Sequence, residues 1–79
     1  MSLSLEELER LESFGANLRR ERCAKGWTQS KLAERAGIST RNLQKAEAGE
    51  FNTLLTTISR FQDALGCSWK KLMSHKTSK

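Results

Sequence analysis

The stretch TQSKLAERAGISTRNLQKAEAG, residues 28–49, decides the fold of this 79-residue chain. It holds two short patterns of helical period. Each opens on a hydroxyl residue, Thr28 or Ser39, whose oxygen can accept a hydrogen bond from a free backbone N–H in the first helical turn. Gly37 lies between the two patterns, where a tight turn is expected. Two short helices joined by a turn that contains glycine form a helix-turn-helix, so we predict an all-α fold.

The second of these helices has one inward face and one polar face. Leu43, Ala46 and Glu47 share the inward face, and the polar face consists of Thr40, Arg41, Gln44, Lys45 and Ala48. The second helix of a helix-turn-helix enters the major groove, where Arg and Lys donate to guanine and Gln pairs with adenine. A threonine can contact a thymine methyl group or a phosphate. The alternative, a merely solvated helix face, leaves the two caps and the glycine turn unexplained.

The stretch and its surroundings resemble the phage repressor and Cro type of helix-turn-helix, also called the XRE type. The resemblance covers about residues 13 to 73. It is carried by Leu18, Arg19, Arg22, Gly26, Trp27, Thr28, Gln29, Leu32, Ala33, Ala36, Gly37, Ile38, Ser39, Leu43, Glu47, Gly49, Ala64, Leu65 and Gly66. This combined pattern is far more specific than the turn alone. It implies a lambda-repressor-like DNA-binding domain, a compact bundle of about five helices.

The resemblance also implies individual roles. It favours Thr40, Arg41 and Lys45 as base readers, with Gln44 and Asn42 ranked after them. The amide of Gln29 is expected to donate to a phosphate oxygen, because a helix N-terminus favours an anion. Further candidate phosphate contacts are Ser39, Asn42, Asn52, Thr53 and Thr56. The proline that this family often carries in the loop after the second helix is absent, and Glu50 is poorly placed beside a phosphate.

A structural ion pair is expected between Arg22 and Glu47. Both residues fall on the inward stripes of their helices, and in the resembling family they fix the angle between the DNA-reading unit and the scaffold. Trp27 immediately precedes the Thr28 cap, a position typical of a packing residue. We therefore expect Trp27 in the core rather than stacked on DNA.

Charge is distributed unevenly along the chain. Of 14 basic and 9 acidic residues, the first 12 positions hold four glutamates and one arginine, so the remainder carries 13 basic and 5 acidic residues, a net charge of +8. A compact domain of this charge attracts a polyanion, either nucleic acid or an anionic membrane surface. The charge therefore agrees with DNA binding without proving it.

Several functional classes lack the residues that they need. The sequence has no run of 18 apolar residues and no export signal, so we expect a cytoplasmic protein that does not enter a membrane. Cys23 and Cys67 lie far apart without nearby histidine, which argues against a metal site and predicts two buried thiols. His75 is the single histidine and there is no tyrosine. We therefore expect no enzyme activity, no cofactor and no small-molecule substrate.

The chain divides into an acidic helical extension (1–12), the helix-turn-helix domain (13–73) and a basic tail (74–79) that is expected to be disordered. Whether residues 1–3 are a cloning remnant is left open. Ser4 and Glu7 form a capping-box pattern that starts a helix reaching about Lys25, either continuous or bent near Ser13. The leucines of the extension either cover the core or form a dimer or partner surface.

Two further helices are expected after the stretch. The first is capped by Asn52 or Thr53 and uses Leu54, Leu55, Ile58, Phe61 and Leu65. The second is a short helix, Trp69 to Met73, capped by Ser68. Phe51 either covers the core or is exposed at a dimer contact. In proteins of the resembling type the closing helix often forms the dimer interface, which makes Trp69, Met73 and Arg60 candidates.

These observations favour a sequence-specific regulator of transcription, with repression as the expected direction. It would bind double-stranded DNA as a homodimer and read the major groove with the helix at 39–48. The alternative is a protein-interaction module, such as the antitoxin of a toxin-antitoxin pair, that binds a toxin or a regulatory subunit.

Overall fold

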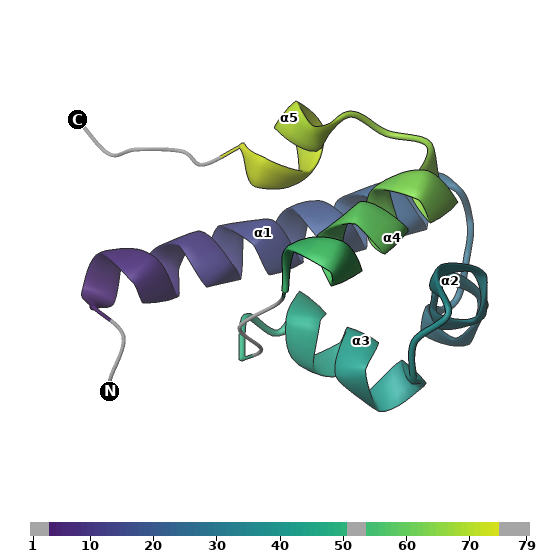
Figure 1. Ribbon diagram of the computed structural model, residues 1–79, viewed down its shortest axis with the longest axis horizontal. Helices are drawn as coiled ribbons and strands as arrows, with labels where there is room; N and C mark the ends of the chain where they lie inside the picture. The colour runs from purple at the N-terminus through teal and green to yellow at the C-terminus, as the bar shows by residue number, and fades with distance from the viewer. Residues whose placement is uncertain (1–3, 51–53, 75–79) are drawn as a thin grey trace.

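The computed structural model describes residues 4–50 and 54–74, and this part of the chain contains five α-helices and no β-strand. The all-α prediction is confirmed. In chain order the helices are α1 (Leu5–Ala24), α2 (Gln29–Ala36), α3 (Thr40–Glu47), α4 (Leu55–Leu65) and α5 (Trp69–Met73). The long α1 crosses the molecule, with α3 on one side and α5 on the other (Figure 1).

The first helix is continuous. Its capping box is complete, because the Glu7 backbone N–H donates to Ser4 Oγ at 3.1 Å and the Ser4 backbone N–H donates to Glu7 Oε1 at 2.8 Å. The helix passes Ser13 without interruption and ends before Gly26, whose φ of 73° suits glycine. The open choice between a straight and a bent helix is thus settled in favour of one helix.

The caps of the helix-turn-helix are where the sequence predicts them. Thr28 Oγ1 accepts from the Lys31 N–H and Ser39 Oγ from the Asn42 N–H, both at 3.1 Å. Gly37 ends α2 in the left-handed region, with φ of 72°. The capping prediction for Ser68 is also confirmed, since its Oγ accepts from the Lys71 N–H at 3.2 Å.

The start of α4 differs from the prediction. Leu54 occupies the N-cap position in place of the predicted Asn52 or Thr53, and among the described residues no side chain makes a capping hydrogen bond to this helix. Leu54 and Leu55 are 69% and 67% exposed rather than part of the core. Burial along α4 begins only at Ile58, because a periodic pattern indicates which face is apolar but not where the neighbouring helices end.

Several predictions fall on residues that the structure does not describe. They concern the residues 1–3, Phe51, Asn52, Thr53 and the tail from His75 to Lys79. Apart from the cap of α4, nothing in the described part of the chain tests them.

One apolar cluster joins all five helices of the described chain. Its members are Phe14, Leu18, Leu32, Ala33, Ala36, Leu43, Ala46, Ile58, Phe61, Leu65 and Leu72. Trp27 packs against the cluster as predicted, while Lys25 Nζ and the Arg35 guanidinium each lie 5.4 Å from its ring centroid. Such cation–π contacts let the outer face of the indole stay near the surface.

The burial prediction for the two cysteines is wrong in part. Cys23 is exposed and only Cys67 is partly buried, because position 23 falls outside the stripe that α1 turns toward the core. Leu5 and Leu8 are also exposed, so these two leucines of the acidic extension do not cover the core.

Candidate nucleic-acid interface

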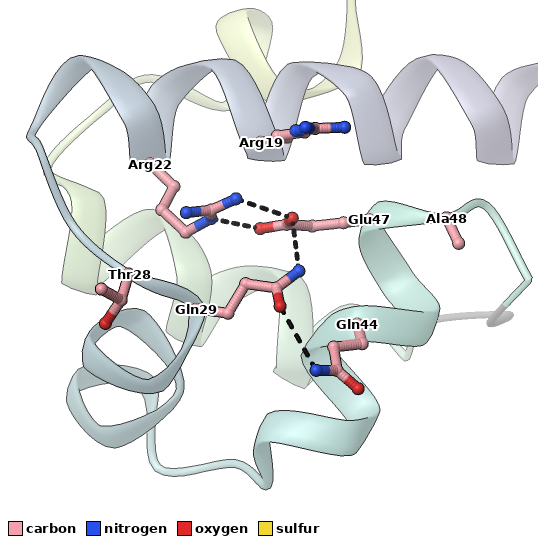
Figure 2. Close-up of a pocket in the computed structure, with 7 residues that line it drawn as sticks. All are labelled: Arg19, Arg22, Thr28, Gln29, Gln44, Glu47 and Ala48. Carbon is pink, nitrogen blue, oxygen red and sulfur yellow. Dashed lines mark hydrogen bonds and ion pairs between the residues drawn. The ribbon is translucent and has the colours of Figure 1, made fainter.

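A buried ion pair joins α1 to α3. Arg22 Nε donates to Glu47 Oε2 at 2.7 Å and Arg22 Nη2 donates to Glu47 Oε1 at 3.1 Å, a bidentate arrangement (Figure 2). The two side chains are only 11% and 4% exposed. A third donor, Arg22 Nη1, reaches the Trp27 carbonyl oxygen at 2.8 Å. The structure therefore brings together the two residues that the sequence pairs.

The hydrogen bond with Glu47 raises the pKa of the Arg22 guanidinium above its ordinary value, against the opposing effect of burial. Arg22 therefore stays cationic at neutral pH.

A chain of amide hydrogen bonds extends from this pair to the surface of α3. Gln29 Nε2 donates to Glu47 Oε1 at 3.0 Å, and Gln44 Nε2 donates to Gln29 Oε1 at 3.3 Å. Figure 2 shows the two hydrogen bonds that link Glu47 to Gln29 and Gln29 to Gln44. The Gln29 amide is thus held between two protein groups, while the second hydrogen of its nitrogen has no acceptor among the described residues. Its role as a phosphate donor stays a prediction.

Gly15 allows α1 and α3 to approach closely. A Cβ at this position would lie 2.5 Å from the carbonyl oxygens of both Ala46 and Glu47. The sequence shows Gly15 only as an unfavourable residue in a helix interior, by about 1 kcal/mol relative to alanine. The structure supplies the reason for it: the backbone of α1 lies directly on the last carbonyls of α3.

The polar edge of α3 faces solvent. Its members, hereafter the reading edge, are Thr40, Arg41, Gln44 and Lys45; Thr40 is half-buried and the other three are exposed. A shallow hollow of about 310 Å³ runs along this edge, lined by Arg41, Gln44, Lys45, Ala48 and Glu50. Gln44 donates to Gln29, and the exposed Arg41 and Lys45 are open to contact with a ligand.

The predicted phosphate contacts are less uniform. Ser39 and Asn42 are exposed beside the reading edge, and the Ser39 oxygen already caps α3. Thr56 is exposed in the first turn of α4. Asn52 and Thr53 lie outside the described residues, so the structure does not place them.

A second hollow, of about 540 Å³, opens between α1, α2 and α3 (Figure 2). We name it the three-helix hollow. It is lined by Arg19, Arg22, Thr28, Gln29, Gln44, Glu47 and Ala48. The sequence motifs include Arg19 only among the residues of the family resemblance and give it no separate role.

Neither a membrane span nor a metal cluster is visible in the described chain. None of the helices in residues 4–50 and 54–74 is long and apolar enough to cross a membrane. In the same ranges no three His, Cys, Asp or Glu side chains gather in a way that could hold a metal ion.

Residues 18–72 match the family model described as helix-turn-helix. The chain belongs to the helix-turn-helix family. This match confirms the resemblance to the XRE and Cro type that the sequence motifs indicate. A comparison with curated protein sequences finds no match.

Two solved structures of similar fold extend this result. The restriction-modification controller protein C.AhdI from Aeromonas hydrophila superposes with a TM-score of 0.76 and 34% identity, over 78% of this chain and 94% of that one. The hypothetical transcription factor NHTF from Neisseria gives a TM-score of 0.81 and 25% identity, over 95% of this chain and 86% of that one. This helix-turn-helix protein therefore shares its fold with a restriction-modification controller protein and a hypothetical transcription factor.

Proposed function

We propose that this chain, a DNA-binding transcriptional regulator, binds double-stranded DNA sequence-specifically and reads the major groove with the reading edge of α3. The observation that carries the proposal is the contrast within α3. Its inner side is held by a buried bidentate pair, while Arg41, Gln44 and Lys45 project into solvent. A fixed helix with exposed donors along one edge is what direct readout needs. Repression is the expected direction of regulation, and the cytoplasm, where DNA is accessible, is the expected compartment.

Each member of the reading edge has a distinct role in this proposal. Arg41 and Lys45 donate to guanine O6 and N7, and Gln44 pairs with adenine. Thr40 contacts a thymine methyl group or a phosphate. The predicted phosphate contacts from Gln29, Ser39, Asn42, Asn52 and Thr53 hold the protein in register on the duplex, since phosphate contacts position and base contacts specify.

The chain acts as a homodimer in this proposal. Exposed apolar side chains at the start of α4 and on α5 support it, namely Leu54, Leu55, Trp69 and Met73. Two copies related by a two-fold axis would present their α3 helices about 34 Å apart, one DNA turn, and so match a palindromic site. Sedimentation velocity at rising protein concentration measures this association directly.

Selection of duplexes from a random pool tests the readout. Wild type is expected to enrich one motif, whereas Arg41→Ala relaxes the sequence preference at one position in each half-site and weakens binding. A dimer that neutralises about six to eight phosphates also gives a log–log slope of affinity against salt near −5 to −7. If Arg41→Ala weakened binding to all sequences equally, Arg41 would not be a reader.

A protein-interaction module is the second candidate. The exposed Leu5 and Leu8 on the acidic first turns of α1 favour it, because they offer an apolar strip that no other described residue covers. An antitoxin would bind a toxin there and DNA through α3. If the purified chain binds its selected DNA without any partner, the interaction module alone does not describe the function.

A further inference from the structure

Arg19 occupies a distinctive place in the three-helix hollow. It lies on the same face of α1 as Gly15 and Arg22, four residues after the first and three before the second, so it faces α3 and not α5. Opposite it, the hollow is lined by Thr28 and Gln29 of the α2 start, and along α3 by Gln44 and Ala48 (Figure 2). Arg19 thus lines the same hollow as Gln44, which is a member of the reading edge.

The Arg19 guanidinium has no bonding partner among the described residues, unlike the arginines near it. Arg20 donates to Asn17 Oδ1 at 3.0 Å and lies 3.5 Å from the Glu21 carboxylate. Arg22 is bound to Glu47 and to the Trp27 carbonyl oxygen. Arg19 is exposed and its donors are unused within the part of the chain that the structure describes.

The charge of Arg19 is also uncompensated. Glu47 is the one acidic residue that lines the hollow, and its two oxygens already accept from Arg22 and Gln29. With Arg19 and Arg22 as the lining cations, the hollow carries a net charge of +1. A free guanidinium above an open, positive hollow suits an oxyanion that accepts two parallel N–H bonds.

We propose that Arg19 binds a phosphate of the DNA backbone in the three-helix hollow, so that α1 joins α2 and α3 in holding the duplex. The inference rests on the proposed function and extends the DNA contact to α1, for which the sequence predicts only a structural role. A phosphate at this site lies next to Gln44, so it fixes the distance between the backbone and one base-reading side chain.

The test measures DNA affinity over a series of salt concentrations for wild type, Arg19→Gln and Lys70→Gln. Lys70 is an exposed lysine of α5, on the opposite side of α1 from α3, and serves as the control for loss of one charge. Each protein is titrated with the selected duplex and with an unrelated duplex. Because Arg19 is exposed, thermal unfolding of Arg19→Gln is expected to match wild type.

Arg19→Gln is expected to weaken binding to both duplexes by the same factor, about tenfold per protomer, as for the removal of one charge-assisted hydrogen bond. The salt slope should fall by about 0.9 for each phosphate that is no longer neutralised. Arg19→Lys should restore the slope and part of the affinity, since it keeps the charge without the fork. Binding and slope equal to those of Lys70→Gln overturn the inference, as does a weakening confined to one sequence.

The two proposals fail in different ways. If wild type binds neither duplex, both are overturned. If wild type binds with a steep salt dependence while Arg19→Gln leaves that dependence unchanged, the phosphate site alone is overturned.

Discussion

Helix α1 holds two other helices by polar contacts of different kinds. Toward α3 it uses a charged pair, Arg22 and Glu47, beside a direct backbone contact at Gly15. Toward α5 it uses one neutral amide: Asn17 Nδ2 donates to the carbonyl oxygens of Leu72 at 2.9 Å and Ser74 at 2.8 Å. Asn17 is the one buried polar side chain in the described core.

The difference follows from what each contact must fix. The bidentate pair has two parallel bonds, so it sets the direction of α3 as well as its position. The amide satisfies carbonyls at the end of α5 that have no partner within the helix. We infer that the α1–α3 contact serves both stability and DNA reading, whereas the α1–α5 contact serves stability and the position of α5, and does not orient α3.

The largest effect is expected from Glu47→Ala. It leaves the Arg22 charge buried without its partner, which costs on the order of 3 to 5 kcal/mol. A domain of this size has only about 5 to 15 kcal/mol of stability, so urea unfolding should show a large decrease in stability. Gln44→Ala removes only an exposed amide and serves as the control; equal melting temperatures for the two variants would refute the buried-pair account.

A double variant distinguishes the contribution of the Arg22–Glu47 pair to stability from its contribution to the orientation of α3. Replacing both partners with apolar residues, as in Arg22→Met with Glu47→Leu, is expected to recover most of the stability that Glu47→Ala removes. DNA affinity should stay low, because the bonds that orient α3 are gone. Full recovery of DNA binding would show that the pair stabilises the fold without orienting α3.

Gly15→Ala is expected to rank next, with a net destabilisation of about 2 kcal/mol. Overpacking typically costs about 1 to 3 kcal/mol, and a Cβ placed 2.5 Å from two backbone oxygens belongs at the upper end, offset by about 1 kcal/mol of helix propensity. At an exposed helical glycine the same change would stabilise. A rise in melting temperature would therefore contradict the close approach of the two helices.

Asn17→Ala is expected to cost about 1.5 kcal/mol, because the Leu72 carbonyl oxygen loses its buried donor. Asn42→Ala, at an exposed position of α3, is the control for unfolding and should be nearly neutral. At temperatures where Asn17→Ala stays folded, its DNA sequence preference should equal that of wild type, because α3 keeps its orientation. A changed sequence preference in the folded variant would contradict the proposed difference between the two contacts.

The smallest effect concerns thiol reactivity. Burial raises the pKa of the Cys67 thiol, and the thiolate is the reactive form, so iodoacetamide near neutral pH should label Cys67 more slowly than the exposed Cys23. Cys67 lies directly before α5, so Asn17→Ala should speed its labelling a few-fold and leave Cys23 unchanged. Equal acceleration at both cysteines would indicate global unfolding instead of local loosening of α5.

The sequence predicts those parts of the structure that depend on neighbouring residues. The caps at Thr28, Ser39 and Ser68 and the turn at Gly37 follow from local hydrogen bonding and backbone freedom. The Arg22–Glu47 pair could be predicted because both charged residues fall on the inward stripes of their helices and the family resemblance pairs them.

Features that depend on distant parts of the chain were missed. Asn17 reads as an ordinary surface residue because its partners lie 55 and 57 positions away. From the sequence alone Gly15 is only an unfavourable residue in a helix, because its contact with α3 depends on the tertiary structure. Leu54 is predicted to lie in the core because the sequence does not show where the neighbouring helices end. For the site, the sequence predicts the chemistry of the reading edge but not the hollow beside Arg19, which three helices form together.

The contact of Gly15 with the end of α3 also determines how a tilt of α3 would displace its residues. The final carbonyls of α3 lie against α1, so a tilt would pivot at the Glu47 end and displace the Thr40 end most. The eight residues of α3 span about 12 Å, so a tilt of about 5° displaces the far end by roughly 1 Å. Hydrogen bonds to bases tolerate only about 0.5 Å of variation in length. A methyl group added at Gly15 that tilts α3 by this angle would therefore move the reading edge out of register with the bases, although Gly15 lies at the other end of the helix.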